Sequence, residues 1–195
     1  MQFMALVSLL ITLFMQRRFM LLMPFGLLLA GLTLMVAMMG EANPQITLLM
    51  PVLASPLLSL HVCVIMAAYS LLAFILLNAI TALILMARKG NEEAVKQLTR
   101  ISRLMLYPAL FCLAAGIFIG AIWANQSWGR YWGWDPKEVW ALITMLVYSI
   151  PMHSQSLTWL QRPRWFHLYM ALAFLSILMT YFGVNFFLGG MHSYA

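Results

Sequence analysis

Long apolar stretches separated by short polar turns form the pattern of this chain. They lie at residues 1–15, 19–39, about 61–87, 104–124, 139–152 and 165–188. A helix needs about 20 apolar residues to cross a bilayer, and the first and fifth stretches are shorter than that. The pattern predicts an all-α, polytopic membrane bundle with about six transmembrane helices. The fifth helix either spans a thin region or packs inside the bundle.

Composition agrees with a membrane protein. Hydrophobic residues make up 64% of the chain and charged residues 8%, whereas a soluble domain is about 25% charged. The first stretch is expected to be a helix and not a signal peptide, because Arg17 and Arg18 follow it instead of preceding it.

The basic residues orient the predicted bundle. If Arg17 and Arg18 face the cytoplasm, six spans place the basic turns at 88–103 and 162–164 there as well, and leave Arg130 and Lys137 outside. The positive-inside rule favours this orientation, with both termini outside. The net charge of +6 then reflects topology and attraction to the anionic headgroups of the lipid bilayer. It does not indicate nucleic-acid binding.

Two regions are expected along the chain. Residues 1–56 would form two N-terminal membrane helices and an outer loop. Residues 57–195 would form a core in which the tryptophan-rich segment 123–138 is a loop at the edge of the membrane.

Two local patterns mark the ends of helices. Pro56, preceded by a serine, is typical of a helix start and places His61 in the second turn of the third helix. Between 88 and 103 we expect a cytoplasmic loop with a short surface helix, supported by a Glu92–Lys96 pair at i, i+4 spacing.

The segment W-A-N-Q-S-W-G-R-Y-W-G-W-D-P-K at 123–137 is a dense aromatic cluster between two apolar stretches. An interfacial belt spreads its aromatic residues over several helix ends, whereas these lie together. We therefore favour a shelf for a large, planar, apolar ligand over simple anchoring. Its aromatic residues are Trp123, Trp128, Tyr131, Trp132 and Trp134.

The end of this segment has the sequence of a helix start. Asp135 is expected at the N-cap, Pro136 at the first helical position and Glu138 at the third, which is the pattern of a capping box. Such a cap would fix the angle between the aromatic segment and the fifth helix.

Two histidines are expected beside the aromatic segment on the outer face. His61 begins the third helix, and His192 follows Gly189-Gly190, the expected end of the sixth. Imidazole is a good iron ligand, and ligands from two helix ends can approach a porphyrin from opposite faces. With the aromatic shelf, this pair suggests a six-coordinate haem site. Arg130 and Lys137 would meet either the haem propionates or lipid headgroups.

The other histidines are expected at the inner end of the bundle. Pro151 leaves the Val147 carbonyl without its helical donor, and a kink there would aim His153 inward. His153 is then either a functional intramembrane group or a snorkelling interfacial residue. His167 is expected to be an interface anchor.

The cysteines support no thiol chemistry. Cys63 and Cys112 lie singly in two apolar stretches. The sequence has no C-x-x-C pair and no C-x-x-C-H, so it predicts neither a zinc site nor covalently attached haem in this chain.

The run W-G-R-Y-W-G-W-D-P-K-E at 128–138 resembles the WWD signature of haem-handling membrane proteins. The ending at 181–195 resembles the G-x-H-S-Y pattern of the CcsA (ResC) branch, which serves system II cytochrome c biogenesis. The resemblance covers residues 57–195 and implies a polytopic helical bundle.

The resemblance also implies roles for individual residues. His61 and His192 would ligate the iron of haem b, held non-covalently in transit, and His153 would belong to an inner haem site. The remaining positions would form the haem platform: Trp128, Gly129, Tyr131, Trp132, Trp134 and Asp135.

The implied activity is to move haem outward and present it, reduced, to the CXXCH motif of an apocytochrome c. The site would lie on the periplasmic face of a bacterial inner membrane, and the partner would be a CcsB (ResB) protein. Relatives often have more spans before this core, and CcsB supplies a second intramembrane histidine. We therefore expect a subunit of a holocytochrome c synthase.

Two other functions stay open from the residues alone. One is a b-type cytochrome or quinol-linked subunit, which needs facing histidine pairs inside the membrane. The other is a haem transporter with no role in attachment.

Overall fold

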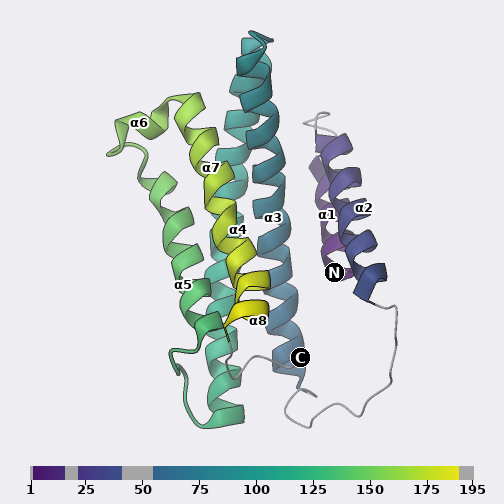
Figure 1. Ribbon diagram of the computed structural model, residues 1–195, viewed down its shortest axis with the longest axis vertical. Helices are drawn as coiled ribbons and strands as arrows, with labels where there is room; N and C mark the ends of the chain where they lie inside the picture. Colours follow the sequence, from purple (N-terminus) through teal and green to yellow (C-terminus); the bar gives the residue numbers. More distant parts are fainter. Residues whose placement is uncertain (1, 16–21, 41–54, 189–195) are drawn as a thin grey trace.

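The computed structural model describes residues 2–15, 22–40 and 55–188. Within these ranges every regular element is helical, and the long helices run along the long axis of the molecule (Figure 1). The long elements are α1 (Gln2–Met15), α2 (Leu22–Gly40), α3 (Pro56–Ala87), α4 (Glu92–Trp128), α5 (Pro136–Ser149) and α7 (Pro163–Leu178). The all-α expectation is confirmed.

Short elements complete the described part of the chain. The 3-10 helix η2 (Ile150–His153) and α6 (Thr158–Gln161) connect α5 to α7. The π-helix η3 (Met179–Gly183) and α8 (Val184–Phe187) continue from the end of α7. A single π-turn inside a longer helix is rare, and those that occur often lie at functional sites. This one lies beside the cavity described below.

Among the described residues, three helical segments are long and apolar enough to cross a membrane: Pro56–Ala87, Glu92–Trp128 and Pro163–Gly183. The apolar helices α1, α2 and α5 are shorter. The molecule is thus an integral membrane protein, while the count of six spans and the outer position of both termini stay predictions.

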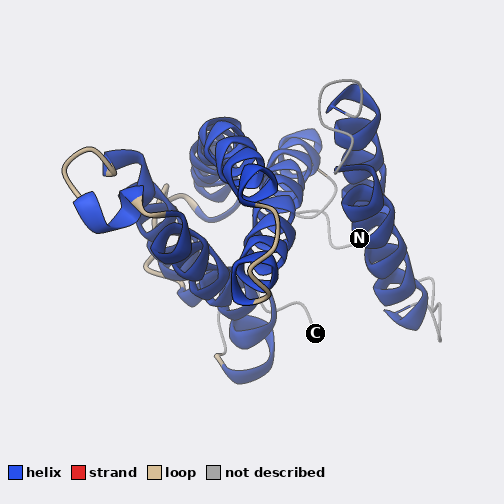
Figure 2. Cartoon of the chain, turned by 90° about the horizontal axis from the view of Figure 1, so that it is seen from above, coloured by secondary structure: helices blue, strands red, loops and turns tan. Residues whose placement is uncertain are grey.

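The antiparallel pair α3–α4 forms the centre of the bundle, and α7 packs against it. Fully buried side chains from these helices, including Phe74, Ile101, Leu113 and Phe166, make one continuous core. Viewed from above, α1 and α2 form a separate pair on one side of α3, with α5 and α7 on the other (Figure 2). The site below is therefore built on the most extensively packed helices.

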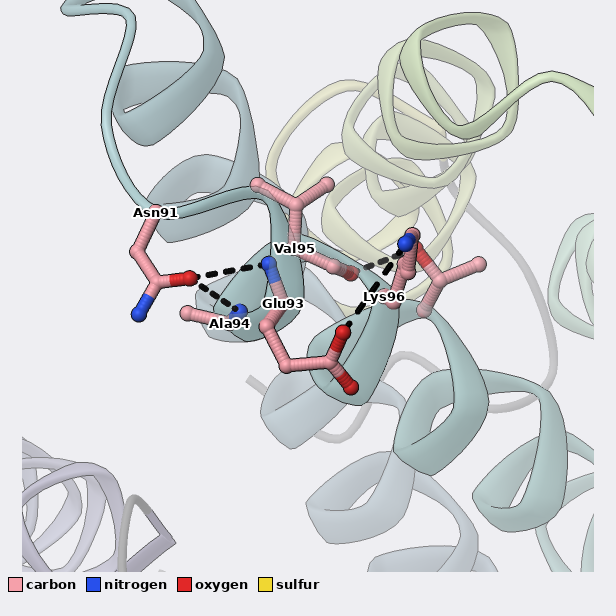
Figure 3. A network of polar contacts seen from close by, with 6 residues as sticks. Asn91, Glu93, Ala94, Val95 and Lys96 are labelled. Atoms are coloured by element: carbon pink, nitrogen blue, oxygen red, sulfur yellow. Dashed lines mark hydrogen bonds and ion pairs between the residues drawn. The ribbon is translucent and has the colours of Figure 1, made fainter.

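The expected loop at 88–103 is wrong, because α4 already begins at Glu92. Asn91 caps it: its Oδ1 accepts hydrogen bonds from the backbone N–H of Glu93 at 2.9 Å and of Ala94 at 3.4 Å (Figure 3). The predicted i, i+4 pair is also wrong. Lys96 instead forms an exposed ion pair with Glu93, at i, i+3 spacing and 3.8 Å.

Candidate functional site

A cavity of about 370 Å³ lies where α3, α4, α5 and η3 meet the aromatic segment. Its volume falls within the roughly 300–1,000 Å³ of small-molecule sites. Aromatic and aliphatic side chains make up most of its wall, as a large apolar ligand requires. The wall includes His61, Ile65, Met66, Tyr69, Ile117, Trp123, Tyr131, Trp132, Lys137, Glu138 and Tyr181.

His61 reaches this cavity from the second turn of α3, where the sequence placed it. Its Nδ1 lies 2.7 Å from the carbonyl oxygen of Gly116 on α4. A carbonyl oxygen only accepts, so Nδ1–H is the donor and the lone pair of the neutral ring resides on Nε2. A metal-binding histidine is commonly oriented in this way by a carbonyl on its other nitrogen.

Two glycines of α4 make room for the imidazole. A Cβ added at Gly120 would lie 2.7 Å from both Cε1 and Nδ1 of His61, and one added at Gly116 would overlap the Ile65 side chain. Small residues at i, i+4 spacing let two membrane helices approach closely. The Gly116-x-x-x-Gly120 spacing is visible in the sequence, although we did not predict a close approach of two helices from it.

The aromatic segment is only partly a loop, contrary to our expectation. Trp123 and Trp128 belong to the last turns of α4, where their rings meet edge to face with centroids 4.9 Å apart. Gly129 ends the helix in the left-handed conformation, with φ of 73°. Such a terminus favours glycine because it has no Cβ to clash.

The other two tryptophans of the segment differ from each other in exposure. Trp132 lines the cavity, whereas Trp134 is 73% exposed and does not. Their rings still meet edge to face, with centroids 6.0 Å apart. Trp134 has a φ of 56°, which is uncommon for a residue with a Cβ and costs energy that the surrounding turn must offset.

That turn is held by the predicted capping box, which the structure confirms. The buried Asp135 accepts from the Lys137 N–H at 3.0 Å, and Glu138 Oε2 accepts from the N–H groups of Gly133 at 2.8 Å and Asp135 at 3.2 Å. The carboxylate of Glu138 thus ties the turn to α5 and fixes the position of Trp134.

Two basic residues flank this turn. Lys137 lines the cavity, and burial lowers the pKa of its amine, although the Asp135 carboxylate acts in the opposite direction. The Arg130 guanidinium packs over Gly133, where an added Cβ would meet it at about 3.0 Å. Lys137 is therefore the better placed of the two to meet an anionic group on a ligand in the cavity.

Of the two interpretations of His153 that the sequence leaves open, the structure does not show the one in which a kink aims its side chain into the bundle. His153 ends η2, its side chain is exposed, and its Nδ1 lies 3.1 Å from the Ser149 carbonyl oxygen. The carbonyl of Val147, which Pro151 leaves without a helical donor, accepts a 2.7 Å hydrogen bond from the Tyr169 hydroxyl of α7. The chain therefore turns at Pro151 without directing His153 into the bundle.

His167 is not an interface anchor, because its side chain is fully buried between α7 and α4. Its Nε2 lies 2.8 Å from the hydroxyl of Thr99, which itself donates to the Val95 carbonyl at 2.8 Å. Since that hydroxyl has one proton, His167 Nε2–H must be the donor of the first bond. The contact joins α7 to α4 near the end of the bundle that carries the α3–α4 turn.

The structure thus brings His61 together with Trp123, Tyr131, Trp132 and Lys137. His192 and Gly189-Gly190 lie outside the described residues. The cavity residues that we did not expect from the sequence include Tyr69, Thr180 and Tyr181, which face it from α3 and η3. They lie in uniformly apolar stretches, and the packing of α7, which continues into η3, against α3 brings them together.

Comparison with known proteins points to one family. The model of the cytochrome c assembly protein family matches residues 1–192. Protein NrfI of Wolinella succinogenes is 43% identical over 175 residues, which are 87% of this chain and 19% of that protein. CcsA of Guillardia theta is 34% identical over 75% of this chain and 56% of its own length. CcsA of Chlamydomonas reinhardtii is 36% identical over 80% and 44%. The chain thus spans between a fifth and about half of the length of these relatives.

Proposed function

Because the chain belongs to the cytochrome c assembly protein family, we propose that it binds haem at its outer face and presents it to an apocytochrome c. The observation that carries the proposal is a histidine with a fixed tautomer on the wall of an aromatic cavity. Haem is here a substrate in transit, bound as non-covalent haem b.

In this proposal Nε2 of His61 is one axial ligand and His192 is the other. The aromatic residues would cover the porphyrin, with Trp132 and Tyr131 against the ring and Trp134 directed outward. Lys137 would pair with a propionate at the cavity wall, where its half-buried charge lacks full hydration. Two imidazoles would hold the iron in a low-spin state until the haem leaves.

The final step would join the haem vinyl groups to the CXXCH cysteines of the apocytochrome through thioether bonds. A CcsB (ResB) protein would complete the synthase, as in system II. The membrane would be the bacterial cytoplasmic membrane, with the cavity on the periplasmic face. His153, at the opposite end of α5, would serve an inner haem site before export.

A b-type cytochrome is less well supported. It needs two histidines facing one another across the bundle, but His61 contacts α4 at Gly116 whereas His167 contacts it at Thr99. The rise of an α-helix places these levels about 25 Å apart. Among the described residues these two histidines therefore do not form a pair.

The test is the visible spectrum of the detergent-purified protein, co-expressed with a CcsB partner. We expect a reduced low-spin haem spectrum that is lost in His61→Gly and in His192→Gly and regained when imidazole is added. Leu60→Gly is the matched control for α3, because Leu60 is exposed and lies off the cavity wall. Unchanged haem content in either histidine variant would contradict the proposed ligands.

A further inference from the structure

A second hollow, of about 510 Å³, lies on α4 near the start of α7, at the end of the bundle away from the haem cavity. We call it the basic groove, and its wall consists of Lys96, Thr99, Arg100, Arg103, Leu104, Tyr107 and Pro163. Lys96, Arg100 and Arg103 follow one another at i, i+4 and i+7, so they share one face of the helix. They cover about 10 Å along its axis.

One cation of the basic groove, Arg103, is held in place by uncharged partners. Arg103 donates from Nη1 to the Ser154 hydroxyl at 3.2 Å and from Nη2 to the Leu160 carbonyl at 2.9 Å. Its guanidinium also stacks on the Phe166 ring at 4.8 Å. These contacts fix the cation without neutralising it, so its charge is available to an anion.

Carboxylates compensate little of this charge. Among the described residues, neither Arg100 nor Arg103 forms a salt bridge. Lys96 pairs with Glu93 (Figure 3), but both side chains are highly exposed, at 68% and 80%. Such surface pairs contribute little free energy and exchange readily for a stronger anionic partner.

The depth of the groove matches a membrane surface. The stretch of α4 at 104–123 separates Arg103 from the outer tryptophans, and at 1.5 Å per residue it is about 30 Å long, the thickness of a bilayer core. The cations therefore lie at the level of the headgroups. Directly below them Leu104, Tyr107 and Phe111 are 51%, 59% and 74% exposed, as lipid-facing side chains are.

We propose that the basic groove binds an anionic phospholipid of the inner leaflet. The phosphate lies among Lys96, Arg100 and Arg103, and an acyl chain lies along Leu104, Tyr107 and Phe111. A positive recess at headgroup depth that continues into an apolar face fits this class of molecule, whereas a zwitterionic lipid would gain less from three cations. The site is independent of haem binding.

The experiment measures binding of phosphatidylglycerol to the full-length protein by native mass spectrometry and by the shift in thermal unfolding, with phosphatidylcholine for comparison. We expect Lys96→Gln with Arg100→Gln to weaken phosphatidylglycerol binding roughly fivefold for each charge removed, and phosphatidylcholine binding to stay unchanged. The control, Arg88→Gln with Lys89→Gln, removes the same charge at the exposed α3–α4 turn, outside the groove.

Two results would overturn the proposal. An equal loss of phosphatidylglycerol binding in the control would show general attraction to an anionic surface in place of a site. Stabilisation by inorganic phosphate equal to that by phosphatidylglycerol, lost in Lys96→Gln with Arg100→Gln, would show a site for a small free anion. Neither result depends on haem, so the haem proposal is tested separately.

Discussion

Replacement of Gly120 by alanine tests how the structure orients His61. The added methyl group would lie 2.7 Å from Cε1 and Nδ1 of the imidazole, whereas ordinary contacts begin at 3.4 Å. The ring must move by the difference, about 0.7 Å or more. That displacement is enough to take the hydrogen bond to the Gly116 carbonyl, now 2.7 Å, out of the favourable range of about 2.7–3.2 Å.

The expected effect on haem binding follows from the loss of that orienting contact. Disturbing the group that orients a metal-binding histidine typically lowers affinity about 10–100-fold, which equals about 1.4–2.8 kcal/mol. The effect on folding is smaller and of mixed sign. Overpacking costs about 1–3 kcal/mol, while alanine in place of glycine inside a helix gains up to about 1 kcal/mol.

The assay is a haem titration of the detergent-purified Gly120→Ala protein, read from the low-spin absorption bands and accompanied by thermal unfolding. Gly31→Ala is the matched control, because a Cβ at Gly31 in α2 would meet nothing within 4 Å. We expect wild-type haem affinity in the control and a loss of at least about tenfold in Gly120→Ala. A folded Gly120→Ala protein with wild-type affinity and spectrum would refute the role assigned to the glycine recess.

Two further predictions concern contacts between helices. Tyr169→Phe should destabilise the protein by about 1–3 kcal/mol, because it leaves the Val147 carbonyl without a donor. The loss is measured by thermal unfolding against the control Tyr107→Phe, which changes an exposed tyrosine, and equal unfolding midpoints of the two variants would contradict the prediction. Thr99→Val should lower the free energy of unfolding by a similar amount, because it removes the acceptor of His167 Nε2–H, whereas Thr99→Ser should retain most of the stability. A Ser variant as unstable as the Val variant would show that the hydroxyl does not stabilise this contact.

Several elements could be predicted because their causes are local. The start of α3 at Pro56 and the capping box from Asp135 to Glu138 depend on residues within one turn of each other. The carbonyl of Val147 was likewise expected to lose its helical donor, since only Pro151 is needed to remove it. In each case the residues that interact lie within about one helical turn of each other in the sequence.

The longer α4 could not be predicted from local pattern. Residues 88–103 are rich in charged residues and resemble a surface loop, yet α4 begins at Glu92. Val95 and Leu98 of its first turns are buried against Ala82 of α3. This burial depends on how α4 returns along α3, and it extends α4 beyond the apolar stretch.

By itself the sequence determined the membrane class, the apolar helices, the aromatic segment and His61 as a candidate ligand, because composition and short-range spacing are enough for these. The tertiary structure alone decided what His61 contacts, since its partner Gly116 is 55 positions away. It also decided that His153 is exposed and His167 buried. These outcomes depend on which helices become neighbours, and they follow from the packing of the whole bundle.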